Sequence, residues 1–252
     1  MKAMILAAGL GTRLRPLTND RPKALVRIQG IPLLEIVIRR LQYYGISEFI
    51  INTHHFADQI TDFLKDKKNF GASITISHEV EMPLETGGAL KKAAPFFSDG
   101  KPFLLCNTDI LTSIDFYKFH KFHKKSKAIA TLATRQRTTS RYLVFDEEDT
   151  LCGWINVKTG ELKMVRMITG CFQLRAFSGL HVIDPKLFKY FGKAKRFSII
   201  DTYLLAATES KIKCYQDEDS IWMDVGKTPA IEAAGKVLGK VLQNNVVNIF
   251  RD

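Results

Sequence analysis

Short apolar runs alternate with amphipathic stretches along the first half of the chain. The apolar runs have strand length and predict strands at residues 3–7, 48–53, 73–77 and 102–106. The stretches between them repeat apolar positions at helical spacing and predict helices over residues 32–44, 58–67, 88–97 and 114–125. This alternation is typical of α/β proteins. We therefore expect a mixed, mainly parallel central sheet flanked by helices.

The second half of the chain is less regular. Apolar alternation predicts strands at residues 128–134, 142–145, 153–157 and 172–181, and helical spacing returns at 198–209 and 229–243. Polar turns such as DEED and KTG favour a mixed or antiparallel, β-rich extension. Because no repeat or linker is evident, we expect one domain over residues 1–252, with halves of about 1–127 and 128–252.

Charge and composition narrow the class of partner. Lys and Arg number 37 against 26 Asp and Glu, a formal charge of +11, which suits nucleic acid, an anionic surface or a substrate with several phosphates. No apolar run approaches the roughly 18 to 20 residues of a membrane span, and no secretory cleavage site follows the first residues. We therefore expect a cytoplasmic protein without a membrane partner.

The four cysteines lie far apart and lack zinc-site spacing, so they are expected to be reduced and mostly buried. The densest basic run, KFHKFHKKSK, covers residues 118–127. On a helix, Phe116, Phe119 and Phe122 would form an apolar seam and leave the lysines in solvent. Because no stacking platform or base-reading motif accompanies this run, a solvated face is favoured over nucleic-acid binding.

The chain opens with MKAMILAAGLGTRLRPLT, an apolar run that turns abruptly glycine-rich and cationic. Gly9 and Gly11 allow positive φ and a close approach by a ligand, and the amides of such a loop converge on an anion. Leu14 replaces the third glycine of a dinucleotide fingerprint, and no Walker motif is present. Arg13 and Lys23 would add a planar donor fork and a mobile charge, so a phosphate site is predicted.

The loop and the residues after it resemble the motif of a known family. LAAGLGTRLRPLT followed by PKAL resembles the motif of the sugar-1-phosphate nucleotidyltransferases, G-x-G-T-R-x-R-P-L-T and then P-K-P-L, with Ala24 in place of the second proline. LETGGAL, CNTDI, FSGLHVIDPKLF and IWMDVGKTPAIEAA resemble later family segments in the same order, so the match runs to about residue 235. The resemblance implies a Rossmann-like, nucleotide-diphospho-sugar transferase fold with a small β-rich sugar-binding extension.

The resemblance also implies a reaction and a set of residues. A sugar 1-phosphate would attack the α-phosphorus of a nucleoside triphosphate and release pyrophosphate, with Mg²⁺ as cofactor. The catalytic residues implied are Arg13, Lys23 and Asp109. The nucleotide-binding residues implied are Leu6, Ala7, Ala8, Gly9, Gly11, Thr12, Arg13, Lys23, Glu85, Thr86, Gly87 and Asn107. The sugar-binding residues implied are Gly88, Ser178 and Gly179, and the metal ligands are Asp109 and Asp224.

The residues support parts of this set and leave other parts open. Two carboxylates at strand ends suit Mg²⁺, which substrate phosphates help to coordinate, although Asp109 or Asp224 could instead cap a helix. Thr86 is a plausible N-cap. Glu85 suits either a helix start or an acceptor for a base or ribose, and nothing local separates these readings.

The substrates are less sharply indicated. Many family members carry an E-K-P segment whose lysine binds the sugar phosphate, but GWINVKTGELKMV stands here instead. Lys158 or Lys163 could substitute, or either could be a surface lysine. The chain looks most like the short subgroup with N-acetylmuramic acid 1-phosphate uridylyltransferase, which suggests UTP with that sugar phosphate. Mannose- or heptose-1-phosphate guanylyltransferase and a non-catalytic sugar-nucleotide-binding regulatory subunit are the alternatives.

The remaining expectations concern further domains and the oligomeric state. The long C-terminal extension of larger family members is absent, so acetyl transfer or allosteric control by such a domain is not expected. The sequence leaves the oligomeric state open between a monomer and a small homo-oligomer.

Overall fold

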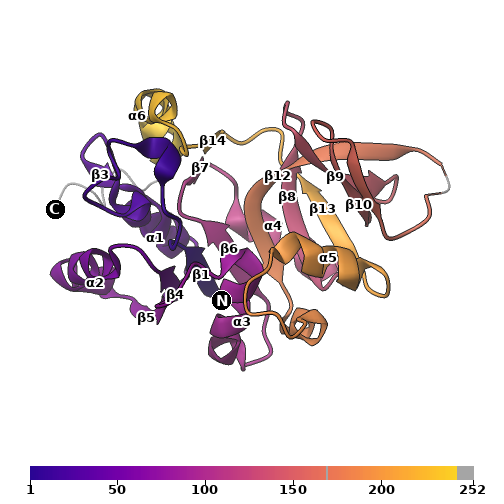
Figure 1. Ribbon diagram of the computed structural model, residues 1–252, viewed down its shortest axis with the longest axis horizontal. Helices are drawn as coiled ribbons and strands as arrows, with labels where there is room; N and C mark the ends of the chain where they lie inside the picture. The colour runs from indigo at the N-terminus through magenta and orange to yellow at the C-terminus, as the bar shows by residue number, and fades with distance from the viewer. Residues whose placement is uncertain (169, 243–252) are drawn as a thin grey trace. The chain divides into compact units, whose positions relative to one another are not determined.

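The computed structural model describes residues 1–168 and 170–242, which form two compact units (Figure 1). Unit 1 comprises Met1–Pro83, Cys106–Phe116 and the described part of Ser220–Asp252. Unit 2 comprises Leu84–Leu105 and Tyr117–Asp219. The prediction of one domain over residues 1–252 stays a prediction, and Gln243, the expected end of the last helix, lies outside the described residues.

Unit 1 contains the parallel strands that the apolar runs predict. Strand β1 (Lys2–Leu6) pairs in parallel with β4 (Glu48–Thr53), and β4 pairs in parallel with β5 (Ser73–His78). Helices α1 (Leu33–Tyr43) and α2 (Ala57–Asp66) join these strands in the chain, and each predicted boundary lies within one or two residues of the observed one.

The rest of unit 1 consists of short elements and one longer helix, from segments far apart in the sequence. They are the 3-10 turns η1 (Thr12–Leu14), η2 (Lys23–Leu25) and η3 (Lys68–Gly71), the antiparallel pair β2 (Arg27–Ile28) with β3 (Ile31–Pro32), the antiparallel pair β7 (Ile110–Thr112) with β14 (Trp222–Asp224), and helix α6 (Thr228–Leu242). No hydrophobic periodicity predicts the two antiparallel pairs, because each strand has only two or three residues.

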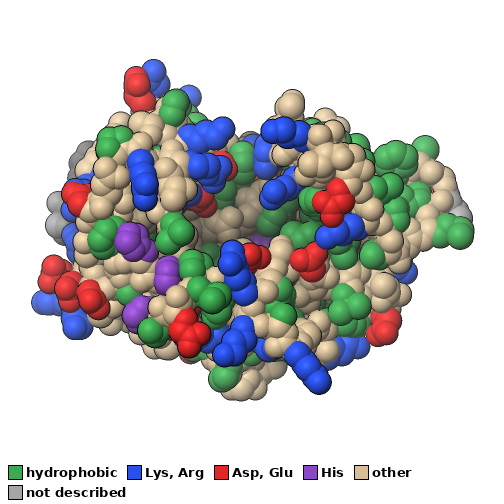
Figure 2. All heavy atoms as spheres, viewed as in Figure 1, with side chains coloured by type: hydrophobic (Ala, Val, Ile, Leu, Met, Phe, Trp, Pro, Cys, Tyr) green, Lys and Arg blue, Asp and Glu red, His purple; other side chains and the backbone are tan. Residues whose placement is uncertain are grey.

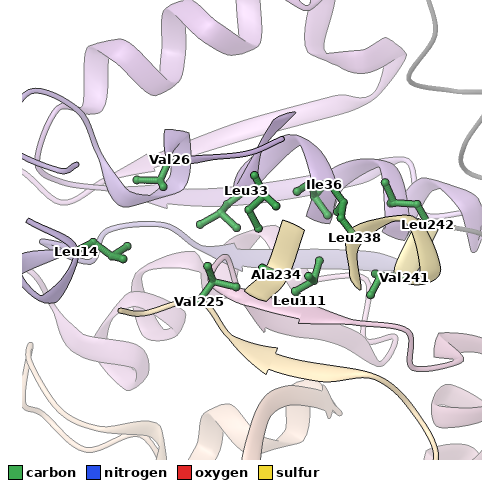
Figure 3. Close-up of a cluster of buried hydrophobic side chains, with 11 residues drawn as sticks. Leu14, Val26, Leu33, Ile36, Leu111, Val225, Ala234, Leu238, Val241 and Leu242 are labelled. Atoms are coloured by element: carbon green, nitrogen blue, oxygen red, sulfur yellow. The ribbon is translucent and has the colours of Figure 1, made fainter. Parts of the chain in front are cut away.

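One apolar cluster holds these elements together, with the exception of η3 (Figure 3). Leu33 and Ile36 of α1 face Leu238 of α6 in this cluster, since helical spacing places their apolar positions on one side of each helix. The loops and short strands contribute single buried side chains to the same cluster, namely Leu14, Val26, Ile28, Leu111 and Val225. The cluster therefore fixes several irregular segments that have little secondary structure of their own.

Unit 2 contains the antiparallel strands that apolar alternation predicts in the second half of the chain. Strand β12 (Phe172–Ile183) pairs antiparallel with both β8 (Ala130–Arg135) and β9 (Arg141–Asp146). The antiparallel order continues through β10 (Leu151–Asn156) to β11 (Glu161–Met164). Strand β13 (Ile212–Gln216) adds to β8 in parallel, so this sheet is mixed.

The remaining elements cover this sheet or connect it to unit 1 along the chain. Helix α5 (Ile199–Ala207) packs against β10 and β13, and α3 (Glu85–Ala93) contacts α5. The 3-10 turns are η4 (Ala94–Phe97) and η5 (Pro185–Tyr190). Strand β6 (Phe103–Asn107) begins in unit 2 and ends in unit 1, and α4 (Phe116–Ser126) begins with a residue of unit 1.

Three surface and burial expectations can be compared with the structure. On α4, Phe116 and Phe119 are buried and Phe122 is half-buried, while Lys118, Lys121, Lys124 and Lys125 are exposed. All four cysteines are free; three are buried and Cys171 is exposed. Burial raises the pKa of the Cys106 and Cys214 thiols to about 12. Of the helices within the described ranges, none combines the length and apolar character that a membrane crossing requires.

Candidate functional site

The glycine-rich loop starts at the end of β1, where a buried hydrogen-bond network fixes its first residue. The amide of Ala7 donates to Asn52 Oδ1 at 2.8 Å, and Asn52 Nδ2 donates to Glu79 Oε1 at 2.8 Å. Both partners are buried, with Asn52 at 3% exposure and Glu79 at 2%. Because buried polar groups of this kind are satisfied only in one arrangement, the network defines the direction in which the loop leaves the strand.

The two glycines of the loop differ in their backbone. Gly11 has φ +66°, and a Cβ there would lie 2.9 Å from Thr18 Cγ2 and 3.1 Å from the Cβ of Lys23. The Thr18 hydroxyl also donates to the Gly11 carbonyl at 2.9 Å. Gly9 does not adopt a positive φ, and the space around its Cα is open. Gly11 therefore adopts the positive φ that glycine allows, whereas a Cβ at Gly9 would meet no other atom within 4 Å.

The cationic residues project from the turn that follows. In η1 the side chain of Leu14 is fully buried in the apolar cluster, while Arg13 and Arg15 are exposed on either side of it. Lys and Arg side chains gather on this indigo part of unit 1, near α6 and β14, with acidic side chains beside them (Figure 2). Because Leu14 anchors the turn in the apolar cluster, Arg13 and Arg15 on either side of it extend into solvent.

The two aspartates predicted as metal ligands lie on neighbouring backbone segments of unit 1. The amide of Val225 donates to the carbonyl of Asp109 at 2.8 Å, and Asp224 is opposite Ile110 in the β7–β14 pair. The amide of Thr108 donates to the Leu6 carbonyl at 3.2 Å, which places the Asp109 segment beside the end of β1. Residues that are more than a hundred positions apart are thereby brought together.

Asp109 contacts Lys23 rather than a helix start. The Nζ atom of Lys23 forms an ion pair with Asp109 Oδ2, and the two side chains are only 15% and 17% exposed. The residue after Asp109 begins β7, and α4 starts only at Phe116. The reading of Asp109 as a helix cap is therefore wrong.

Gly226 shows how closely the charged groups approach one another. A Cβ at this position would lie 2.6 Å from Asp224 Oδ1 and 3.0 Å from Arg13 Nη2. The Nζ atom of Lys23 would be 3.4 Å from the same point. Since Gly226 has no positive φ, the absence of a side chain matters here for space rather than for backbone conformation. Arg13, Lys23 and Asp224 therefore surround one small volume. We call these three residues and Asp109 the charge cluster.

The charge cluster is built from side chains next to buried anchors. Arg13 precedes Leu14, and Asp224 precedes Val225. Lys23 lies three residues before Val26, and Asp109 lies two residues before Leu111. A single apolar cluster therefore fixes the backbone from which all four charged side chains project.

The charge cluster fits a hard divalent cation of the Mg²⁺ type. Asp109 and Asp224 supply two carboxylates, and the described parts of the chain contain no group of three His, Cys, Asp or Glu residues that could hold a metal alone. Mg²⁺ is commonly bound through one or two carboxylates while waters and substrate phosphates complete its shell. Arg13 and Lys23 are the donor types that bind phosphate oxygens.

Four more of the predicted nucleotide-binding residues also lie in unit 1. Leu6 ends β1, and Ala8 is 7% exposed behind the loop. Thr12 is exposed at the start of η1, and Asn107 is partly exposed at the end of β6. The structure therefore brings the predicted phosphate and metal residues together in one unit.

The residues predicted to contact the base lie in unit 2, at the start of α3. Glu85 accepts a hydrogen bond from Arg196 Nε at 3.0 Å, in a pair that is about half exposed. The hydroxyl of Thr86 accepts from the amide of Ile199 at 3.0 Å, at the first turn of α5. Leu84 is the N-cap of α3. The expectation that Thr86 caps its own helix is therefore wrong, because its hydroxyl serves a different helix.

At the adjacent Gly87 and Gly88, other residues of the chain occupy the space where a side chain would lie. A Cβ at Gly87 would lie 2.4 Å from the Phe197 ring, and a Cβ at Gly88 would lie 2.2 Å from the Lys195 carbonyl. The amides of Gly87 and Gly88 both point to the Phe197 carbonyl, at 3.0 and 3.3 Å. The two glycines thus allow residues 195–197 to pack closely on α3.

The other predicted sugar-binding residues lie in the middle of β12. The pairing of β12 with β8 shifts register between Phe177 and His181, and Gly179 has φ +76° within this irregular stretch. Ser178 is buried in the same stretch. A buried hydrogen bond of 2.6 Å joins His181 Nδ1 to the Tyr203 hydroxyl of α5. Burial lowers the pKa of His181 to about 3, so the ring is neutral at pH 7.

The two lysines considered for the sugar phosphate have different surroundings. Lys163 on β11 lies 3.4 Å from Asp201 and 3.5 Å from Glu161, and its Nζ is 5.5 Å from the Trp154 ring centre. The carboxylate of Asp201 raises the pKa of Lys163. Lys158 is exposed in the turn before β11. Lys163 is therefore a charged, half-exposed lysine that is paired with acidic side chains.

Sequence reasoning missed the supporting residues of the loop. Asn52 lies within β4 and Glu79 directly follows β5, and no local pattern indicates that Asn52 bonds Ala7 and Glu79. Thr18 and Gly226 stand inside the quoted motifs, so their positions in those motifs were the available signal.

Comparison with known proteins gives the relatives of this chain. The family model described as nucleotidyl transferase matches residues 2–240. A UTP–glucose-1-phosphate uridylyltransferase of Synechocystis sp. is 29% identical, over 97% of this chain and 65% of the relative. An N-acetylmuramate alpha-1-phosphate uridylyltransferase of Caulobacter vibrioides is 30% identical, over 92% of this chain and 94% of the relative. The chain thus spans about two thirds of the first relative and nearly all of the second.

Other similarities extend this comparison. The catalytic subunit beta of mannose-1-phosphate guanylyltransferase from Dictyostelium discoideum is 30% identical, over 90% of this chain and 61% of the relative. The crystal structure of HddC from Yersinia pseudotuberculosis complexed with GMP-PN superimposes with a TM-score of 0.75 at 22% identity, over 94% of this chain and 99% of HddC. The fold class expected from the sequence, a mixed and mainly parallel central sheet with flanking helices, is confirmed.

Proposed function

Because this chain belongs to the nucleotidyl transferase family, we propose that it transfers a nucleotidyl group from a nucleoside triphosphate to a sugar 1-phosphate. The products are a nucleotide-sugar and pyrophosphate, and the reaction depends on Mg²⁺. The chemistry needs no protein nucleophile, because a phosphate monoester has lost most of its second proton at pH 7, its pKa being about 6.

The convergence of four charged side chains beside the glycine loop carries this proposal. Arg13 and Lys23 are the cations, Asp109 and Asp224 are the anions, and all four lie within unit 1. A regulatory binding subunit needs the cations for affinity, but it has no need of two carboxylates beside them. Their presence favours turnover over binding alone.

In this mechanism the chain acts by positioning and by charge stabilisation. The amides of residues 9–12 and the Arg13 guanidinium hold the triphosphate. Lys23 stabilises the negative charge that builds on the α-phosphate as the sugar phosphate attacks in line. Asp109 and Asp224 would hold Mg²⁺, which supplies further neutralisation of the two crowded phosphates when it is bound. Glu85, Thr86, Gly87 and Asn107 stay predictions for nucleotide contacts, as do Gly88, Ser178 and Gly179 for the sugar.

For the substrates we favour UTP and N-acetylmuramic acid 1-phosphate. The Caulobacter relative is named for uridylyl transfer to N-acetylmuramate 1-phosphate. It aligns with 92% of this chain over 94% of its own length. The chain also lacks the E-K-P segment, as the members of that short subgroup do. Mannose- or heptose-1-phosphate guanylyltransferase activity is the second candidate, supported by the similarity to the Dictyostelium subunit.

One coupled assay tests the function and the substrates together. Purified protein is incubated with each combination of UTP, GTP, CTP or dTTP and muramic, mannose, glucose or heptose 1-phosphate, and pyrophosphate release is measured with and without Mg²⁺. Release that requires both substrates and Mg²⁺ supports the proposal, with UTP and N-acetylmuramic acid 1-phosphate fastest. Binding of a nucleotide-sugar without any release in the whole panel would favour the regulatory subunit instead.

Location and assembly belong to the same proposal. A cytoplasmic site of action follows from the substrates, since nucleoside triphosphates are made there. A monomer or small homo-oligomer stays a prediction, and light scattering after size-exclusion chromatography measures it directly.

A further inference from the structure

The contact between Lys23 and Asp109 has a consequence for cation binding. Lys23 Nζ is paired with Asp109 Oδ2, and both side chains are more than four-fifths buried. A partly buried ion pair of this kind is screened less by solvent than a surface pair. In this arrangement the predicted metal ligand Asp109 already has a positive partner.

The whole charge cluster is balanced in the same way. Its two carboxylates and two cationic side chains sum to no net formal charge, and three of the four groups lie within 2.6 to 3.4 Å of one point beside Gly226. A free divalent cation approaching Asp109 and Asp224 therefore meets the ammonium of Lys23 and the guanidinium of Arg13 at short range. Like charges at such distances oppose binding strongly where water is partly excluded.

We propose that Lys23 acts as an internal counter-ion that keeps the divalent cation out until nucleotide phosphate is present. This inference rests on the proposed function, because it assigns the incoming phosphate to a nucleoside triphosphate. The triphosphate brings negative charge to the loop, and the flexible stem of Lys23 lets its ammonium move from Asp109 to a phosphate oxygen. Asp109 is then free for the cation. Lys23 is thus a positioning residue for the metal as well as a phosphate ligand, and the cation and nucleotide enter together.

Manganese binding to the nucleotide-free protein tests this directly. Mn²⁺ is titrated into the full chain and the free ion is followed by electron paramagnetic resonance, without nucleotide or sugar phosphate. The Lys23→Met variant, which keeps the stem and removes the charge, is expected to bind Mn²⁺ at least tenfold more tightly than the wild type. Lys23→Arg keeps the charge and should bind as weakly as the wild type.

Two further variants separate this effect from a general change of charge. Lys65→Met removes an exposed lysine of α2 in the same unit and should leave Mn²⁺ affinity unchanged. Lys23→Met combined with Asp109→Asn should lose the gain, because the released carboxylate is gone. Circular dichroism of each variant confirms that the chain is folded before the titration.

The outcomes are distinct from those of the activity assay. Equal or weaker Mn²⁺ binding by Lys23→Met overturns the inference even if wild-type protein releases pyrophosphate. A tenfold gain that Lys23→Arg also shows would overturn it as well, since the gain would then come from altered packing. Tighter binding by Lys23→Met alone supports it, even where no substrate pair in the assay turns over.

Discussion

The amide of Val225 donates a 2.8 Å hydrogen bond to the carbonyl of Asp109. This bond joins a segment near the middle of the chain to one near its C-terminal end, and it places Asp109 and Asp224 on adjacent backbone. Val225 is itself fully buried in the apolar cluster of unit 1. The backbone that carries the two carboxylates is therefore positioned by main-chain hydrogen bonding and by core packing.

Removing a charged group of the cluster should slow catalysis far more than it lowers stability. Arg13→Ala, Lys23→Ala and Asp109→Asn are each expected to reduce the rate of pyrophosphate release by about 10² to 10³, because each removes an oriented electrostatic contact from the reacting phosphates. Initial rates at saturating substrate measure this, with thermal unfolding as the check on the fold. A wild-type rate in folded Asp109→Asn would remove this aspartate from the mechanism.

Adding one methyl group at Gly226 should disturb the charge cluster without straining the backbone. In Gly226→Ala the new Cβ would meet Asp224 Oδ1 at 2.6 Å and Arg13 Nη2 at 3.0 Å, so one of these groups must move. We expect at least a tenfold loss of kcat, since a small misplacement of such groups is costly.

Gly239→Ala on α6 is the matched control for this variant. Nothing lies within 4 Å of its Cβ position, and its φ is not positive. Activity should be unchanged, and stability should rise by up to about 1 kcal/mol because alanine favours helix. Equal activity loss in both variants would show that the effect at Gly226 is not local.

A methyl group at Gly87 should destabilise unit 2. The Cβ of Gly87→Ala would lie 2.4 Å from the Phe197 ring, and overpacking of a close contact costs about 1 to 3 kcal/mol. The midpoint of urea unfolding is the measurement, with Gly192→Ala as the control because its Cβ position is open. If Gly87→Ala were as stable as that control, residues 195–197 would not be packed on α3 as described.

Stability should fall in mild acid because two buried histidines are neutral in the folded chain. Burial lowers the pKa of His181 to about 3 and that of His123 to about 4. The unfolded chain binds these protons near pH 6.5, so between about pH 6 and pH 4 it holds protons that the folded chain lacks. The free energy of unfolding should therefore decrease by roughly 1.4 kcal/mol per pH unit for each histidine as the pH falls through this window.

The contribution of His181 can be separated by measuring how steeply the free energy of unfolding changes with pH. His181→Gln removes a titrating group, so the variant should lose stability less steeply than the wild type between pH 6 and pH 4, whatever its stability at pH 7. Urea titrations at several pH values give this slope. An unchanged slope would mean that His181 takes up its proton without unfolding.

The sequence by itself determined the fold class and the family. The regular strands and helices of unit 1 were predictable because their apolar spacing matches a period of two or of about 3.6, as in β4 and α1. The family was predictable because Gly11, Arg13 and Lys23 fall in a long composite motif.

Only the tertiary structure decided which charged residues meet. The β7–β14 pair has three residues in each strand, too few for a period, and it forms because Leu111 and Val225 are buried in the same apolar cluster. The partner of Asp109 could not be inferred either, since Lys23 reaches it across 86 residues of sequence. Local patterns report the backbone preference of neighbouring residues, whereas these contacts depend on the burial of apolar anchors that are distant in the chain.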